Sequence, residues 1–463
     1  MVRFGHVYAR VRLLGVDRSA SRCVIADTRA PDSVDVLSAI RAEGGDARRG
    51  DFQRIGPLHL GLILTRRSRL VLARHGQADL VRSHGSAASR EERTIGEHEE
   101  QSDPRPLVVH LLPDDPPRGA QTYARAIRDR LDGRRSRHIL MTLFASDETF
   151  ASDLALDVPR RQSLLGVFNP RAAVALRRAL RRLEPDVLVA HGGEPLKYAG
   201  LVAPRATKLV YLKIGSSQVQ LRSKTRRFIY ATLAQRFDIV AGVSQEMVAE
   251  AADLLRVPPD RLVYIPNGRD PARFRPAQHG AHLPVRLCFV GYLTRTKRPE
   301  RFIEVVRYVR SQGFDASGLI VGGGPLERSL AVTARDAHVE MLGVRDDVPA
   351  VLAGSDVFLF TSIAEGEGMP GVLIEAGMAG LPTVSTSVAG ARDVIEHGVT
   401  GFVVPIDDFT ALATAAAGLV SSPELRAQMG SAARERCLEH FTLDASAMRL
   451  EGVLESLIAG SAA

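Results

Sequence analysis

Two glutamates with seven residues between them, Glu367 and Glu375, stand in the segment EGEGMPGVLIEAGMAGLP. The proline and glycines between them predict a loop that turns into a helix near Gly371. The first N–H groups of that helix, at Gly371 and Val372, have no acceptor inside the helix, and with the helix dipole they favour an anion such as a diphosphate. Glu375 follows one turn later on the same side, where a carboxylate can accept hydrogen bonds from the two hydroxyls of a ribose.

Glu367 precedes the helix and is placed to hold hydroxyls of a group beyond the phosphates. The segment therefore fits ribose, diphosphate and sugar in that order, which is the layout of a nucleotide-sugar. An isolated pair of glutamates at this spacing is more often two solvent-exposed acids, so the surrounding sequence has to decide between the two interpretations.

The elements that must position these residues are strands and helices in alternation. From residue 107 onward, strand patterns such as LVVHLL, HILMTLF, DVLVAHG and KLVYLKI alternate with helical patterns, and a second series begins at VRLCFVGYL and runs through IVGGGP, DVFLFTS and GFVVP. This alternation predicts an α/β fold of two doubly wound, Rossmann-like parallel-sheet domains. Ligands bind at the carboxyl ends of the strands in such sheets, so we expect a cleft where the two domains face each other.

We predict an N-terminal domain for the acceptor at 106–275, a C-terminal domain for the donor at 276–445, and a C-terminal helix at 446–463. The join lies in the Pro-, Gly- and Arg-rich segment IPNGRDPARFRPAQHGAHLP. Residues 1–105 lack the alternation and include the polar stretch GSAASREERTIGEHEEQSDPRP. We predict an N-terminal extension there, and a small domain, a disordered segment and a mis-assigned start remain open alternatives.

Composition narrows the classes of partner. The chain has 463 residues, a net charge of +8 and a pI of about 9.7, which favours anionic partners. Aromatic residues make up 5% and tryptophan is absent, so no nucleic-acid partner is expected. Three dispersed cysteines predict neither a disulfide framework nor a zinc ribbon. No apolar run reaches the ~18 residues of a membrane span, so we expect a cytoplasmic protein, with peripheral attachment to the inner face of the plasma membrane left open.

The segment EGMPGVLIEAGMAGLPTVSTSVAGARDVIEHGVTGFVV resembles the donor site of retaining glycosyltransferases of family 4, which have the two-domain GT-B fold. DIVAGVSQEMV, IPNGRDPARFRP, IVGGGPLERSL and VEMLGVRDDVPAVLAGSDVFLFTS are similar to that family in the same order. The resemblance covers about residue 107 to the end and is densest between 238 and 404. It implies that Glu367 contacts the donor sugar, that Glu375 holds the ribose, and that the amides of Gly371 and Val372 hold the diphosphate. Met369 belongs to the same set of expected donor contacts.

The resemblance also implies roles for residues elsewhere in the second domain. In VGYLTRTKR, Lys297 matches a lysine of the family, whereas Tyr292 stands where an arginine is usual. Arg295 lies two residues from Lys297 and could compensate for that change. Gly323, in GGGP, would line the nucleotide pocket, and a tight turn that packs a strand on a helix is the alternative. A dinucleotide fingerprint would need a third glycine where Glu327 stands. Arg345 would lie near the base. For Lys297, a solvated loop cation is the alternative.

In the first domain, the resemblance implies that His191, just past the strand DVLVAHG, lies close to the reacting sugar. Arg118 and Gly119, in PPRGAQTY, would contact the acceptor. The alternatives are a structural histidine at a strand end and a simple turn between strand and helix.

The inferred reaction transfers a hexosyl group from a UDP- or GDP-linked sugar to an acceptor hydroxyl in glycan or glycolipid biosynthesis, with retention of anomeric configuration. The leaving phosphate takes the acceptor proton, so no cofactor and no metal ligands are expected. The acidic pairs in PDDPP, RDDV and IDDF are more typical of helix caps and turns than of a D-x-D metal loop.

Two other functions remain open from the sequence. A non-catalytic nucleotide-sugar-binding pseudoenzyme is supported by Tyr292, and a glycoside hydrolase would use Glu367 and Glu375 as acid and nucleophile. Two basic helices also have two interpretations, a solvated face or docking on anionic lipid that brings a lipid-linked acceptor to the cleft. Their cations are Arg177, Arg178, Arg181 and Arg182 in one helix and Lys224, Arg226 and Arg227 in the other.

Overall fold

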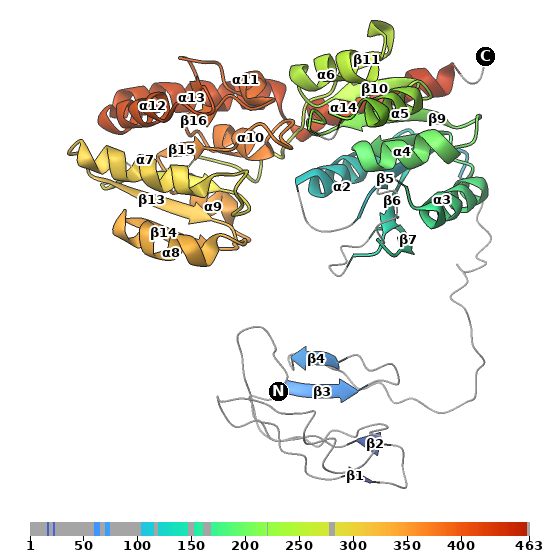
Figure 1. Cartoon of the computed structure of the whole chain (residues 1–463), viewed down its shortest axis with the longest axis horizontal. Helices are drawn as coiled ribbons and strands as arrows, with labels where there is room; N and C mark the ends of the chain where they lie inside the picture. The colour runs from blue at the N-terminus through green and yellow to red at the C-terminus, as the bar shows by residue number, and fades with distance from the viewer. Residues whose placement is uncertain are drawn as a thin grey trace. The chain divides into compact units, whose positions relative to one another are not determined.

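The computed structural model describes residues 103–114, 119–146, 152–160, 168–219, 221–276 and 283–460, together with four short strands nearer the N-terminus (Figure 1). Those strands form two antiparallel pairs, β1 (Val16–Asp17) with β2 (Arg22–Cys23) and β3 (Leu60–Leu64) with β4 (Leu70–Arg74). They belong to a compact unit, Met1–Glu100, that is distinct from the unit Gln101–Ala463. Apart from these strands and a few residues after 102, the extension predicted at 1–105 lies outside the described residues.

The first sheet of the larger unit has seven parallel strands in the order β11-β10-β9-β8-β5-β6-β7. Their bounds are β5 (Leu107–Leu112), β6 (Arg137–Phe144), β7 (Leu154–Val158), β8 (Val187–His191), β9 (Lys208–Lys213), β10 (Ile239–Gly242) and β11 (Leu262–Tyr264). The central strands are buried along their whole length, as the continuous apolar runs predict for a parallel sheet covered on both faces.

Helices cover both faces of this sheet. One face packs on α3 (Pro170–Leu183), α4 (Gly193–Val202), α5 (Lys224–Ala234) and α6 (Gln245–Leu255). The other packs on α2 (Gly119–Leu131) and on the last helix of the chain, α14 (Leu443–Ala459). A 3-10 turn, η1 (Pro259–Arg261), leads into β11.

The second sheet has six parallel strands in the order β14-β13-β12-β15-β16-β17. They are β12 (Val285–Val290), β13 (Ala316–Val321), β14 (Val339–Gly343), β15 (Val357–Phe360), β16 (Thr383–Thr386) and β17 (Gly401–Val404). The helices around it are α7 (Pro299–Ser311), α8 (Glu327–Asp336), α9 (Val348–Ala353), α10 (Gly371–Met378), α11 (Ala391–Val394), α12 (Phe409–Ser421) and α13 (Pro423–His440). The predicted pair of doubly wound parallel sheets is confirmed.

The chain passes between the two domains twice, at one place. The N–H of Arg269, in the first crossing, donates to the carbonyl of Phe441 (2.9 Å), and the N–H of Leu443, in the second, donates to the carbonyl of Arg269 (2.8 Å). Beyond this contact α14 returns to the first domain, where the hydroxyls of Tyr123 and Ser446 are hydrogen-bonded. The last helix of the sequence is therefore part of the core of the first domain (Figure 1).

Candidate active site

The start of α10 follows the loop that leaves β15. Pro370 caps the helix with an extended backbone, and the next two residues, Gly371 and Val372, begin the first turn. They and Glu375 are half-buried, whereas the rest of α10 is buried. The two helix-start amides and Glu375 thus share the one accessible side of this short helix, which is the geometry that their spacing predicts.

Glu367 and Lys297 form an ion pair, with 2.5 Å between Lys297 Nζ and Glu367 Oε1. Lys297 also lies over the ring of Phe360, 5.2 Å from its centroid. The backbone holds the two loops together, because the N–H of Ile363 donates to the carbonyl of Thr296 (2.8 Å). The structure therefore brings together two predicted site residues that lie 70 positions apart in the chain.

Arg269 is a residue of this site that the sequence analysis missed. Its Nε donates to Glu375 Oε1 (2.6 Å) and its Nη1 to the carbonyl of Gly268 (3.0 Å). A Cβ on Gly371 would lie 1.6 Å from Arg269 Nη2, so the guanidinium is packed directly against the start of α10. The side chains of Arg269 and Glu375 are only 17% and 18% exposed. Nothing in the linker sequence IPNGRD signals this contact, because it depends on where the chain crosses between domains.

The loop after β9 brings the first domain to the glutamate loop. The N–H of Ser216 donates to the carbonyl of Glu367 (3.0 Å), and a Cβ on Gly368 would lie 2.3 Å from the carbonyl oxygen of Ile214. The loop is anchored by the buried pair of Lys213 and Glu250, which are 2.7 Å apart. The carboxyl end of a first-domain strand therefore lies against the glutamate loop, as the predicted cleft requires.

His191 ends β8 and is buried, with 1% of its surface exposed. Burial lowers its pKa to about 3, so the imidazole is neutral at pH 7. Its Nε2 is hydrogen-bonded to Nδ1 of His110 at 3.0 Å. The described contacts do not join His191 to Glu367 or Lys297.

The remaining predicted donor residues lie around β12, β13 and β14. Gly323 stands in a turn that packs on the loop after β12, where a Cβ on the neighbouring Gly322 would lie 2.0 Å from the carbonyl oxygen of Gly291. Arg345 is exposed and paired with Asp347 at 2.6 Å. Arg295 is exposed and has no partner among the described contacts, and Tyr292 is 64% exposed.

The predicted acceptor contacts are only partly described. Arg118 lies outside the described residues, and Gly119 is the exposed first residue of α2.

Met369, a predicted donor residue, is 4% exposed, and its carbonyl accepts a hydrogen bond from Asn267 Nδ2 (2.8 Å). Across the described ranges, no three His, Cys, Asp or Glu side chains are grouped as a metal site. Within the same ranges, no helix is both long and apolar enough to span a membrane.

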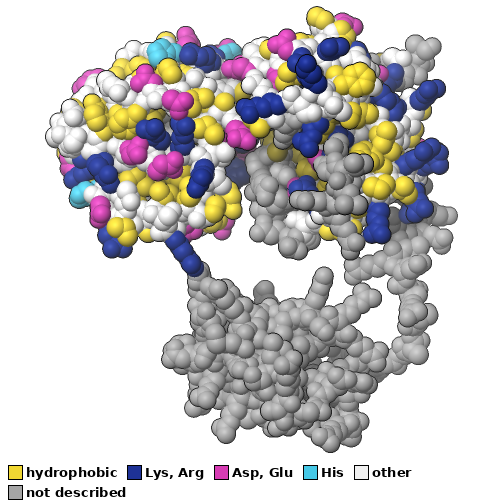
Figure 2. All heavy atoms as spheres, in the orientation of Figure 1, with side chains coloured by type: hydrophobic (Ala, Val, Ile, Leu, Met, Phe, Trp, Pro, Cys, Tyr) yellow, Lys and Arg dark blue, Asp and Glu magenta, His cyan; other side chains and the backbone are white. Residues whose placement is uncertain are grey.

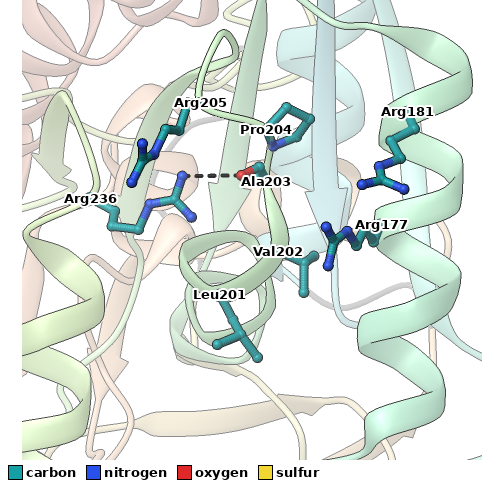
Figure 3. Close-up of a pocket in the computed structure, with 8 residues that line it drawn as sticks. All are labelled: Arg177, Arg181, Leu201, Val202, Ala203, Pro204, Arg205 and Arg236. Carbon is teal, nitrogen blue, oxygen red and sulfur yellow. Dashed lines mark hydrogen bonds between the residues drawn. The ribbon is translucent and has the colours of Figure 1, made fainter.

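A basic hollow of about 490 Å³ lies on the first domain, where α3 and α4 end (Figure 3). Its guanidinium groups come from Arg177 and Arg181 of α3, from Arg205, and from Arg236, which donates to the carbonyl of Ala203 at 3.1 Å. Among the residues that the structure describes, no acidic side chain lines it. Figure 2 shows further Lys and Arg side chains gathered over α3, at the right-hand edge of the molecule.

Comparison with known proteins agrees with this arrangement. Residues 117–273 match the family described as Glycosyltransferase Family 4, and residues 284–422 match Glycosyl transferases group 1. The chain is 27% identical over 382 residues to the GDP-mannose-dependent alpha-(1-6)-phosphatidylinositol monomannoside mannosyltransferase of Mycobacterium tuberculosis, covering 75% of this chain and 97% of that one. It is 30% identical over 291 residues to the putative colanic acid biosynthesis glycosyltransferase WcaL of Escherichia coli, covering 59% and 71%.

Among solved structures, Anabaena Alr3699/HepE in complex with UDP and glucose superposes with a TM-score of 0.63 at 20% identity, over 76% of this chain and all of that one. This likeness concerns the fold, and it agrees with the two sheets described above. The matches in both domains, with the 30% identity to WcaL over 71% of that protein, show that the chain belongs to the family 4 glycosyltransferases, and the superposition agrees with their GT-B fold.

Proposed function

We propose that the protein is a retaining glycosyltransferase that moves a hexosyl group from a UDP- or GDP-linked sugar to an acceptor hydroxyl in glycan or glycolipid biosynthesis. The observation that carries the proposal is the accessible side of α10, where two helix-start amides and Glu375 lie together beside the pair of Lys297 and Glu367. Family membership supports the reaction class. A relative named for a phosphatidylinositol monomannoside and a neighbour solved with UDP and glucose support the classes of acceptor and donor.

In the proposed donor complex, the amides of Gly371 and Val372 face the diphosphate and Glu375 faces the ribose. Lys297 neutralises charge on the leaving diphosphate, and its ion pair with Glu367 holds that side chain beside the sugar hydroxyls. The anomeric C–O bond breaks toward the diphosphate, and the acceptor oxygen forms the new bond on the same face. The acceptor proton passes to the departing phosphate oxygen, so charge and atoms balance without a protein base, a cofactor or a metal ion.

Arg269 supplies the second cation of the proposed donor site. Its Nε occupies Oε1 of Glu375, which leaves Oε2 for the ribose hydroxyls. The other end of the guanidinium lies at Gly371, beside the diphosphate amides. This placement offers a substitute for the family arginine that Tyr292 replaces. Arginine suits the role because its planar fork can hold a carboxylate and face a phosphate at once. Four further residues remain proposed donor contacts: Arg295, Met369, Gly323 and Arg345.

His191 stays a proposed catalytic residue near the reacting sugar. On the acceptor side, we keep Arg118 and Gly119 as proposed contacts and anionic lipid as a proposed docking partner. Four arginines around one hollow without an acid favour a phosphate-bearing surface. Such docking would place a cytoplasmic protein at the inner face of a membrane, next to a lipid-linked acceptor. Nucleic acid is not among the proposed partners.

A thermal-shift screen over UDP- and GDP-sugars tests the donor site, since selective binding raises the melting temperature. We expect Glu375→Ala to abolish the shift that the cognate sugar nucleotide produces. Glu365→Ala is the matched control, because Glu365 is an exposed acid in the loop that precedes α10. An equal shift in Glu375→Ala and Glu365→Ala would rule out the ribose role.

A further inference from the structure

Three buried histidines form a hydrogen-bonded chain across the first sheet. His138 Nδ1 lies 2.9 Å from His110 Nε2, and His110 Nδ1 lies 3.0 Å from His191 Nε2. At the far end, Ser136 Oγ lies 2.7 Å from His138 Nε2. The three rings are 3% exposed or less.

The hydrogen-bonded chain runs from the amino-terminal ends of these interior strands to their carboxyl ends. β6, β5 and β8 are neighbours in the sheet, and all run in the same direction. His138 stands near the start of β6, His110 within β5, and His191 at the carboxyl end of β8. Ser136 directly precedes β6, at the amino-terminal end of the strands. The chain therefore links the side where ligands bind in such sheets to the side away from it.

Burial makes the three rings neutral. It lowers the pKa of His138 to about 4, that of His191 to about 3, and that of His110 well below its usual value. A neutral imidazole has one N–H donor and one lone pair. Every ring directs Nε2 toward Ser136 and Nδ1 the other way, so only two arrangements satisfy the chain. Either all three rings carry the proton on Nδ1, or all three carry it on Nε2.

The groups at the two ends of the histidine chain indicate which kind of ligand group can bind His191. The hydroxyl of Ser136 can donate or accept, so it fits both arrangements. At the other end, Nδ1 of His191 is buried and has no partner among the described protein groups. A ligand hydroxyl there would also fit both arrangements, whereas a carboxylate would fit only a protonated Nδ1 and an ammonium group only a lone pair.

We propose that Ser136, His138 and His110 are positioning residues that act through His191, fixing as one unit which of its nitrogens carries the proton when Nδ1 meets a sugar hydroxyl. The identity of that hydroxyl rests on the proposed function. The coupling of the three rings does not, because it follows from their hydrogen bonds alone. Apolar residues at these three strand positions would fill the core equally well, so packing alone does not explain the histidines. A buried polar network of this kind is favourable only when all its members are paired.

The test uses the full chain labelled with ¹⁵N at histidine, because the ring nitrogen signals report which nitrogen is protonated. Each signal is assigned by single replacement. We expect His138, His110 and His191 to be neutral near pH 7 and to share one tautomer. Different tautomers on adjacent rings would overturn the proposal.

Ser136 provides the sharper variants, because it lies at the end of the chain away from His191. Ser136→Ala removes the terminal hydroxyl. We expect this variant to change the tautomer populations of His191, at the carboxyl end of β8. Ser136→Thr keeps the hydroxyl and should restore them. His440→Gln, on the half-exposed end of α13, is the control and should leave them unchanged. Unchanged His191 signals in Ser136→Ala would contradict the coupling.

A second measurement separates this inference from the donor site. Adding the sugar nucleotide chosen by thermal shift should move the Nδ1 signal of His191. Ser136→Ala should slow the release of nucleoside diphosphate from that donor during transfer, at unchanged donor affinity. A donor that binds by thermal shift without moving that signal would overturn the sugar contact of His191 and leave the donor site standing. Absence of any donor shift would instead count against the proposed function.

Discussion

Replacing Gly371 with alanine should disrupt the contact between Arg269 and Glu375. The added Cβ would lie 1.6 Å from Arg269 Nη2 and 2.4 Å from its Cζ, against the ~3.5–4.0 Å of an ordinary contact. The guanidinium must therefore move, although its Nε is held by Glu375 at 2.6 Å and its Nη1 by a carbonyl. A hydrogen bond to a charged group contributes about 1.5–3 kcal/mol, so we expect a loss of about 2 kcal/mol of stability.

A double-mutant cycle isolates this contact. Arg269→Ala alone should cost a similar amount, because it leaves a half-buried Glu375 without its cation. Once the guanidinium is gone, Gly371→Ala has room for its methyl group and should cost less than about 0.5 kcal/mol. The expected coupling energy is thus about 1.5–2 kcal/mol, well outside the error of additivity for independent sites.

The assay is thermal unfolding of the wild type, the two single variants and the double variant. For a domain of this size, a loss of about 2 kcal/mol corresponds to a decrease of about 4–8 °C in Tm. Gly418→Ala and Gly452→Ala are matched controls, because a Cβ at either helical position meets nothing within 4 Å. The reasoning fails if Gly371→Ala melts with these controls, or if the two single effects simply add.

Three further outcomes follow from the site and its surroundings. Burial and the nearby Glu246 raise the pKa of Asp393 to about 6. The folded protein therefore binds a proton at Asp393 more tightly than the unfolded chain does, and it loses stability as pH rises from about 4 to 6. Asp393→Asn should therefore raise Tm at about pH 8 and not at about pH 4, and equal effects at both would refute the assignment. Lys297→Met should weaken a nucleoside diphosphate about tenfold more than the nucleoside in calorimetry, since it removes a phosphate cation, and equal losses would contradict that role. Burial holds the pKa of His138 near 4, so its share of stability is complete above about pH 6.5 and lost as pH falls through 4, and His138→Gln should flatten the acid side of the Tm profile.

Local sequence determined the elements and one side of the site. Apolar runs of strand length alternating with helical patterns predict two parallel sheets, because burial imposes its period on each segment separately. Pro370 and Gly371 mark the start of α10, and helical spacing alone places Glu375 on the same side as the first amides. The pair of Lys297 and Glu367 agrees with the family text, although spacing alone does not join two residues 70 positions apart.

Only the tertiary structure determines which distant side chains are in contact with one another. Arg269 reaches Glu375 across 106 positions only because the chain crosses between the domains at that point, beside Phe441 and Leu443. The three histidines are visible in the sequence as polar residues in apolar strands, yet they meet because β5 lies between β6 and β8. A period of hydrophobicity records which side of an element is buried, whereas the order of strands and the path of a linker are set by packing over the whole domain.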